Sequence, residues 1–263
     1  MTAPQNVTAD DKLVRLPAET VAAALNRLAE GMSPQEIMQL AMQAFSGRIA
    51  LVSSFGSESA ALLHMVGEID RATPVLFLET GMLFAATIAY QQDLAELLGL
   101  TDVRLIRPTR EDLKRDDPKG TLHRSDPDAC CTIRKTLPLQ RALEGFEAWI
   151  TGRKRYQAAS RADLPIFEAD AEGRIKVNPL ADWDARMIRD YMVAHDLPLH
   201  PLVNENYPSI GCAPCTTPVA PGEDPRAGRW RGHEKLECGI HFMDGKVVRV
   251  ESRTQEGVIA AFP

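Results

Sequence analysis

Four cysteines of this chain occur as two close pairs, which is the pattern of a metal site. Cys130 and Cys131 are adjacent, and Cys212 and Cys215 enclose two residues in a Cys-Ala-Pro-Cys run. Four thiolates can hold a tetrahedral zinc ion or an iron–sulfur cluster. The side chains of adjacent cysteines diverge, and a cluster with separated iron atoms tolerates this better than a single ion does. The residues alone leave zinc and iron–sulfur equally open.

The fifth cysteine, Cys238, lies in a Glu-Cys-Gly-Ile-His run and is a candidate nucleophile. Gly239 gives the backbone freedom, while His241 and Lys235 are cations close in sequence that favour the thiolate form. A thiolate at such a position can attack an electrophilic substrate. A buried, inert cysteine is the alternative, but the polar surroundings of Cys238 argue against it.

At the ends of three predicted strands, a glycine lies next to or near a serine or threonine in the sequence. Each instance alone is compatible with an ordinary turn, but parallel strands bring their carboxyl ends to one edge of a sheet, where helix N-termini favour anions. Together they predict a nucleotide cradle. The residues are Ser53, Ser54, Gly56 and Ser57 at the end of the first predicted strand, Thr80 and Gly81 at the end of the second, and Thr151 and Gly152 at the end of the fourth.

Basic residues form three tight clusters in a chain whose formal net charge is −6. The clusters are Arg134 with Lys135, residues 153–155 with Arg161, and residues 226–231. Any one of them could be a solvated surface. Their position beside the strand ends and the thiols indicates an anionic substrate.

The elements that would position these residues alternate between strand and helix. We predict strands over 48–55, 74–79, 103–107 and 148–151, with helices over 57–68, 84–98 and 132–143. This order implies βαβ units and an α/β fold, in which helices flank a parallel twisted sheet. Residues 108–129 are predicted to be irregular. After Gly152 we expect a short strand at 175–180, a helix at 183–195 and an irregular segment from 197 onward.

The chain divides into three predicted regions. Residues 1–45 would form an N-terminal arm and helices, with residues 1–11 disordered and a helix start at Ser33. Residues 46–205 would form the α/β nucleotide-binding domain. Residues 206–263 would form a C-terminal segment that carries the Cys-Ala-Pro-Cys run and Cys238.

Composition excludes several classes of protein. The 263 residues are 44% hydrophobic and 25% charged, as in ordinary globular proteins. The acidic balance disfavours a nucleic-acid partner, and no window approaches the roughly 20 apolar residues of a membrane span. The polar N-terminus is unlike a secretory signal, and an odd cysteine count argues against a disulfide framework. We therefore expect a cytoplasmic protein without nucleic-acid or membrane partners.

Taken together, these motifs resemble the assimilatory sulfonucleotide reductases, which reduce adenylyl sulfate or its 3′-phosphorylated form. The combination of the paired cysteines with the Glu-Cys-Gly-Ile-His run is highly specific for this family. The matching segments are SSFGS at 53–57, Thr80-Gly81, CCTIRK at 130–135, TGRKRYQ at 151–157, NPLADW at 178–183, LPLHPLV at 197–203, YPSIGCAPCT at 207–216, GEDPRAGRW at 222–230 and ECGIH at 237–241.

The resemblance implies a fold of the adenine-nucleotide α-hydrolase type with a modified PP-loop at 53–59. Phe55 stands where the ATP-cleaving loop has glycine, and Glu58 where it has aspartate, which weakens the case for ATP hydrolysis. The family also implies that Cys130, Cys131, Cys212 and Cys215 bind a [4Fe–4S] cluster. Members with these four cysteines resemble adenylyl-sulfate reductases.

The reaction implied by the resemblance is thioredoxin-dependent reduction of adenylyl sulfate to sulfite and AMP through a sulfonate on the Cys238 thiol. The reductant would be thioredoxin or a glutaredoxin-like protein. His241 would assist Cys238, and Lys135, Arg226 and Arg229 would contact the phosphosulfate. The nucleotide would be held by Ser53, Ser54, Gly56 and Ser57, with Thr80 and Gly81 in the cradle and Gly152 and Arg155 lining the pocket.

The sequence departs from the family pattern at a few positions. The second strand ends Glu79-Thr80-Gly81-Met82 rather than with aspartate and a basic residue, and Lys154 replaces a usual arginine. The chain continues past His241, where Asp244-Gly245 predicts a small hairpin. Two alternatives therefore stay open: a reductase that accepts the 3′-phosphorylated nucleotide, and a nucleotide-binding metal or redox sensor. Homo-oligomer formation also stays open.

Overall fold

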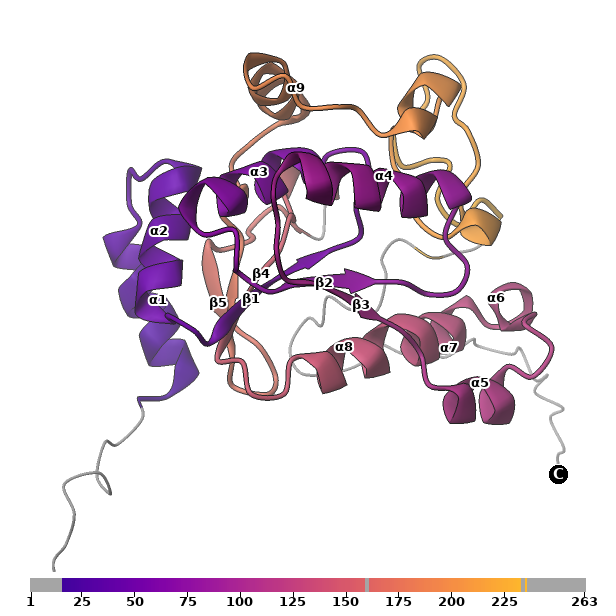
Figure 1. Cartoon of the computed structure of the whole chain (residues 1–263), viewed down its shortest axis with the longest axis horizontal. Helices are drawn as coiled ribbons and strands as arrows, with labels where there is room; N and C mark the ends of the chain where they lie inside the picture. Colours follow the sequence, from indigo (N-terminus) through magenta and orange to yellow (C-terminus); the bar gives the residue numbers. More distant parts are fainter. Residues whose placement is uncertain (1–15, 159–160, 233–234, 236–263) are drawn as a thin grey trace, which may run out of the picture.

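A six-stranded sheet in the order β3-β2-β1-β4-β6-β5 forms the centre of the molecule (Figure 1). The computed structural model describes residues 16–158, 161–232 and 235. Five strands are parallel, and the edge strand β5 is antiparallel to β6. The predicted α/β fold with a parallel sheet is thus confirmed, with one antiparallel edge. The strands are β1 (Ile49–Ser53), β2 (Val75–Leu78), β3 (Val103–Ile106), β4 (Ala148–Ile150), β5 (Phe167–Ala169) and β6 (Ile175–Val177).

Helices cover both faces of this sheet. In Figure 1, α3 (Ser59–Ile69) and α4 (Ala85–Leu97) lie above the strands, and α8 (Leu137–Ala142) lies below them. Alternate residues of a strand enter opposite cores: Leu51 belongs to the larger cluster, whereas Ala50 packs with Leu139 of α8 in the smaller one. Strands buried on both faces read as continuous apolar runs, which is why β1 and β2 were predictable.

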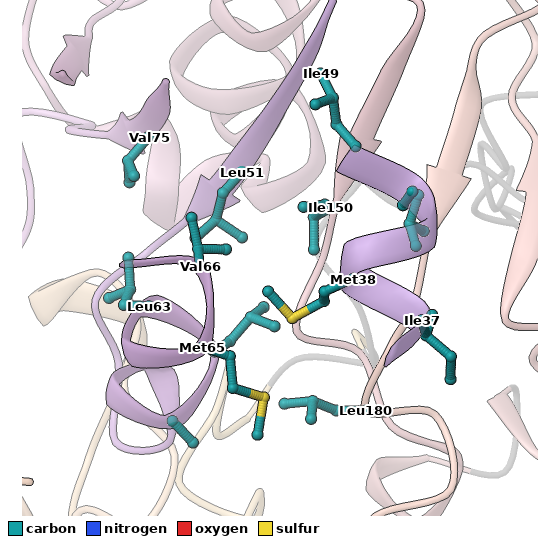
Figure 2. Packing of buried hydrophobic residues seen from close by; sticks show 14 of the residues in the cluster. Ile37, Met38, Ile49, Leu51, Leu63, Met65, Val66, Val75, Ile150 and Leu180 are labelled. Carbon is teal, nitrogen blue, oxygen red and sulfur yellow. The ribbon is translucent and has the colours of Figure 1, made fainter. Parts of the chain in front are cut away.

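The N-terminal helices α1 (Ala18–Leu28) and α2 (Pro34–Ala44) cover one end of the sheet. Ser33 begins α2 as predicted, because its side chain accepts from the Glu36 amide while the Glu36 carboxylate accepts from the Ser33 amide. Met38 of α2 points into the larger core beside Ile150 of β4 and Met65 of α3 (Figure 2). These contacts fix α2 against the sheet.

The prediction that residues 108–129 are irregular is wrong. They contain α5 (Arg110–Asp116), α6 (Leu122–Ser125) and most of α7 (Pro127–Cys131), followed by a π-helix at Thr132–Thr136. Side-chain caps start two of these helices: Thr109 accepts from the Asp112 amide, and Asp126 accepts from two amides at the start of α7. Caps rather than an apolar stripe define such short helices, so hydrophobic periodicity missed them.

Strand β5 was also not predicted, because only Phe167 of its three residues is buried. Asn26 of α1 covers this edge: its amide nitrogen donates to the Phe167 carbonyl oxygen at 2.8 Å, and its carbonyl oxygen accepts from the Phe167 amide at 3.0 Å. The predicted helix at 183–195 is present as α9 (Ala185–Ala194). Short 3-10 turns at Pro201–Glu205 and Ala213–Cys215 follow in the segment predicted to be irregular. None of the helices within the described ranges has the length and apolar character needed to cross a bilayer.

Candidate functional site

A cavity of about 200 Å³ lies beyond the carboxyl ends of β1 and β4. These neighbouring strands mark the point where the chain order in the sheet reverses, which is where α/β folds bind ligands. Several predicted substrate-binding residues line this cavity. They are Ser53, Ser54, Gly56, Ser57, Gly152, Arg226 and Arg229.

The loop after β1 makes its turn at Phe55, whose φ of +48° is in the left-handed region that glycine adopts without strain. The Phe55 side chain is fully buried and meets Phe77 edge-on, with ring centroids 5.0 Å apart. The Phe55 amide donates to Ser53 Oγ at 3.1 Å. Aromatic packing therefore holds a backbone turn of the kind that glycine adopts most readily.

The N-terminus of α3 opens onto the cavity directly after this loop. Ser59 Oγ donates to the Gly56 carbonyl oxygen at 2.9 Å, which closes the first turn. Ser57 Oγ donates to the Pro208 carbonyl oxygen at 2.6 Å, so the segment around Pro208 lies against the loop. Unpaired amides and the helix dipole at this end favour an anion.

Five cationic side chains line the cavity, namely Arg153, Lys154, Arg161, Arg226 and Arg229. Arg229 Nη1 donates to Ser209 Oγ and to the Ile210 carbonyl oxygen, both at 3.3 Å. Gly211 leaves room for this arginine, since a Cβ there would lie 2.3 Å from the guanidinium. The cations make the cavity suited to a phosphate or sulfate group.

Glu58, the residue before α3, is held by three side chains. Its Oε2 accepts from Lys154 Nζ at 2.7 Å and from Gln157 Nε2 at 3.0 Å, while Oε1 accepts from the Tyr156 hydroxyl at 2.5 Å. Burial raises the pKa of Glu58, but the Lys154 charge and these hydrogen bonds outweigh it and hold that pKa below its usual range. Glu58 is therefore ionised at neutral pH.

Three predicted substrate-binding residues do not line this cavity. Arg155 donates from Nε to the Leu164 carbonyl oxygen at 2.9 Å and forms an ion pair with Asp182. Thr80 lies instead beside one of the paired cysteines, and Gly81 lies beside Arg134, whose Nη1 would be 3.5 Å from a Cβ at this position. Thr80 Oγ1 is 3.3 Å from Cys212 Sγ.

The four paired cysteines line one small second cavity together with Lys135 and Trp230. Cys130 and Cys131 are the last residues of α7. Cys212 and Cys215 lie in a 3-10 turn, in which Thr216 Oγ1 donates to the Cys212 carbonyl oxygen at 2.9 Å. Burial, reinforced by Cys212 and Cys215, raises the pKa of the Cys130 thiol to about 11, although Arg134 opposes this. Within the described ranges, no three cysteine, histidine or acidic residues form a group that could hold a single metal ion.

Arg134 is a residue whose role the sequence did not reveal. Its Nη2 donates to Asp117 Oδ2 at 2.7 Å and its Nη1 donates to the Thr80 carbonyl oxygen at 2.9 Å. Burial raises the pKa of Asp117, but the Arg134 hydrogen bond and charge bring it below its usual range. The buried ion pair joins the π-helix after Cys131 to the C-terminal end of α5, and the hydrogen bond to Thr80 joins it to the segment after β2.

The two cavities are adjacent, since Arg229 lines both. Lys235 forms an ion pair with Asp128 of α7, and its Nζ is 5.8 Å from the Trp230 ring centroid. Cys238, His241, the predicted hairpin at Asp244-Gly245 and the arm at 1–11 lie outside the described residues.

Comparisons with known proteins agree on one family. A model of the phosphoadenosine phosphosulfate reductase domain matches residues 48–218. The chain is 53% identical over 222 residues to adenosine 5′-phosphosulfate reductase of Mesorhizobium japonicum, covering 84% of this chain and 87% of that protein. It is 39% identical over 227 residues to phosphoadenosine 5′-phosphosulfate reductase of Gloeobacter violaceus, covering 85% and 94% respectively.

A solved structure supports the same assignment. The phosphoadenylyl-sulfate reductase of Candida auris, in a phosphate complex, matches with a TM-score of 0.65 at 27% identity. The match covers 74% of this chain and 96% of that one. The chain belongs to the phosphoadenosine phosphosulfate reductase domain family.

Proposed function

We propose that this protein reduces adenylyl sulfate to sulfite and AMP in sulfate assimilation, with thioredoxin or a glutaredoxin-like protein as the dithiol reductant. The observation that carries the proposal is the cationic cavity at the end of β1, which adjoins the cavity of paired cysteines through Arg229. The name of the Mesorhizobium relative supports adenylyl sulfate as the substrate.

In the proposed reaction, the Cys238 thiolate attacks the sulfur atom of the bound sulfate group. The bond between that sulfur and the AMP phosphate oxygen breaks, and AMP leaves with the electron pair. The product is a sulfonate on Cys238. A thiolate of the reductant then attacks the Cys238 sulfur and sulfite leaves. The second thiol of the reductant resolves the mixed disulfide, so its dithiol supplies both electrons.

The residues of the cationic cavity would bind and orient the substrate for this transfer of the sulfonate group. Arg226 and Arg229 would hold the phosphosulfate, and Ser53, Ser57 and the α3 N-terminus would hold the nucleotide. His241 would assist at Cys238.

We further propose that Cys130, Cys131, Cys212 and Cys215 hold a [4Fe–4S] cluster. The donor set fits, because four thiols from two distant segments line one cavity and the remaining lining includes Arg134 and Lys135, which balance thiolate charge. When bound, the cluster would order this end of the site and add local electrostatics beside Lys135. Lys135 would in turn contact the phosphosulfate.

The test is sulfite release by anaerobically purified protein with reduced thioredoxin, measured in parallel with adenylyl sulfate and its 3′-phosphorylated form. We expect sulfite from adenylyl sulfate, and none from the Cys238→Ser variant. The cationic lining and the name of the Gloeobacter relative favour acceptance of the 3′-phosphorylated nucleotide as the second candidate. Absence of sulfite from both nucleotides in protein that contains iron would overturn the enzyme proposal and favour a sensor.

A further inference from the structure

One buried nitrogen atom beside the paired cysteines has no hydrogen-bond partner. His123 lines the cavity that the four cysteines share, and its Nδ1 is buried without a partner among the described residues. A buried polar atom that makes no hydrogen bond is costly, and folded proteins rarely keep one without a functional reason. A group that occupies this cavity and accepts from His123 would supply such a reason.

The backbone holds His123 against the cavity. His123 is the second residue of α6, which begins at Leu122. The Leu122 amide donates to Asp117 Oδ1 at 3.0 Å, and the other oxygen of this carboxylate accepts from Arg134 Nη2 at 2.7 Å. One buried carboxylate thus anchors both the start of α6 and the π-helix that follows the adjacent cysteines.

The sulfur atoms of the cavity are acceptors of the kind that this nitrogen lacks. A neutral imidazole donates from one of its two nitrogens, and the sulfur atoms around a metal centre accept hydrogen bonds from nearby donors. One cysteine already lies within hydrogen-bond distance of a hydroxyl group, since Thr80 Oγ1 is 3.3 Å from Cys212 Sγ. An N–H donor from His123 would add a second contact of this type on the side of α6.

We propose that His123 is a positioning residue of the cysteine cavity, which donates from Nδ1 to a sulfur atom of the [4Fe–4S] cluster. The inference rests on the proposed function and adds a residue outside the four proposed ligands. Such a donor stabilises negative charge on the sulfur atoms, and outer partners of metal ligands commonly contribute about 10–100-fold to metal affinity. Four thiols complete the ligand set, so His123 supports the cluster without binding iron.

The experiment measures how fast anaerobically purified protein loses iron to excess EDTA, followed as the loss of the visible absorbance of the cluster. His123→Phe keeps a ring and removes the donor. We expect this variant to contain iron and sulfide when freshly purified, and to lose iron roughly tenfold faster than wild type. His123→Asn should stay within about threefold of the wild-type rate, because both side chains branch at Cγ and the amide nitrogen can donate in place of Nδ1.

Matched variants separate the hydrogen bond from the packing of α6. Arg124 is the next residue of the same helix, but it is exposed and does not line the cavity. Arg124→Gln should therefore lose iron at the wild-type rate. His123→Leu also lacks the donor and should lose iron as fast as His123→Phe, so it serves where the phenylalanine variant folds poorly.

Resonance Raman spectra give a readout that helix packing alone does not change. The proton of an N–H donor exchanges with D2O, so the exchange should shift the Fe–S stretching bands of wild type. The shift should be smaller in His123→Phe and retained in His123→Asn and Arg124→Gln. An equal shift in all four proteins would overturn the proposal.

The rates of iron loss can overturn it as well. A wild-type rate in folded His123→Phe or His123→Leu would do so, and so would equal acceleration in Arg124→Gln or His123→Asn. Freshly purified His123→Phe and His123→Asn that both lack iron would identify His123 as a ligand, which also contradicts the donor role.

The proposed function is judged separately by sulfite release. Wild-type protein that contains iron and sulfide but releases no sulfite would end the enzyme proposal, while the rates of iron loss would still judge His123. Wild-type protein without iron and sulfide would overturn the cluster and the role of His123 together.

Discussion

At the level of single residues, Phe55 shows how side-chain packing can maintain a left-handed backbone turn. We expect Phe55→Ala to lower the free energy of unfolding by about 3–5 kcal/mol, because it removes a fully buried aromatic ring. Phe55→Gly should be more stable than Phe55→Ala by roughly 1 kcal/mol, since glycine relieves the positive φ. Urea unfolding of both variants measures this difference. An alanine variant more stable than the glycine variant would show that the turn carries no strain.

The paired cysteines allow a second test at this scale. Cys212→Ser should bind less than half of the wild-type iron and acid-labile sulfide, because one of the four proposed ligands is lost. Cys238→Ser should retain the full content, since Cys238 is the proposed nucleophile. Iron and sulfide analysis after anaerobic purification compares the two. A full complement of iron in Cys212→Ser would remove Cys212 from the ligand set.

The sequence could locate the cavity but not the orientation of every side chain around it. Ser53 ends one apolar strand and Gly152 follows another, so their place at the carboxyl edge of a parallel sheet was predictable. The loop after β4 has no regular period, and nothing in Arg153-Lys154-Arg155 shows which cations turn inward. The structure places Arg153 and Lys154 in the cavity and pairs Arg155 with Asp182.

At the level of elements, the Arg134–Asp117 ion pair fixes the π-helix that follows the adjacent cysteines. Arg134→Met should lower the free energy of unfolding by about 3–5 kcal/mol, because it leaves a buried carboxylate without its partner. The double variant Arg134→Met with Asp117→Leu should recover most of that loss. Urea unfolding of the single and double variants tests this. A single variant within about 0.5 kcal/mol of wild type would contradict a structural role for the pair.

Helices and strands could be predicted where the sequence shows a run of buried apolar residues or a clear capping signal. Strands β1 and β2 are apolar on both faces, and the Ser33 capping box starts α2, so all three could be read from the sequence. Helices α5, α6 and α7 are too short to show a stripe. Their caps and ion pairs, such as Arg115 with Asp112, emerge only when the chain is folded. Strand β5 depends on pairing with β6 and on Asn26.

At the level of the whole molecule, the candidate site forms only when the segment after α9 docks against α4. Tyr90 of α4 donates to the Pro198 carbonyl oxygen at 2.8 Å, and Thr87 Oγ1 lies 3.0 Å from His200 Nε2. The chain beyond His200 supplies Ser209 and Cys212, which line the two cavities. Docking at His200 thus links the sheet to the segment that lines both cavities.

This docking should depend on pH through His200. Its imidazole is fully buried, and burial lowers the pKa of His200 from 6.5 to about 4. His200 Nδ1 accepts from the Leu202 amide at 3.2 Å, so the neutral ring donates from Nε2 to Thr87. Between pH 6.5 and about 4 the unfolded chain binds a proton at this residue that the folded chain does not. The contribution of neutral His200 to stability is therefore complete above pH 6.5 and is lost as the pH falls toward 4.

A His200→Gln variant isolates this effect from other acid-sensitive groups. It should be less stable than wild type at pH 8, because a well-packed ring is lost, yet its stability should fall less steeply between pH 7 and pH 5. Urea unfolding at several pH values gives both slopes, and His195→Gln is the matched control, since His195 caps the end of α9 and is not fully buried. Parallel slopes for wild type and His200→Gln would mean that His200 binds its proton equally well in the folded and the unfolded chain, and would contradict the prediction. A flatter slope confined to His200→Gln would establish that burial of this one neutral imidazole makes the stability of the fold depend on pH.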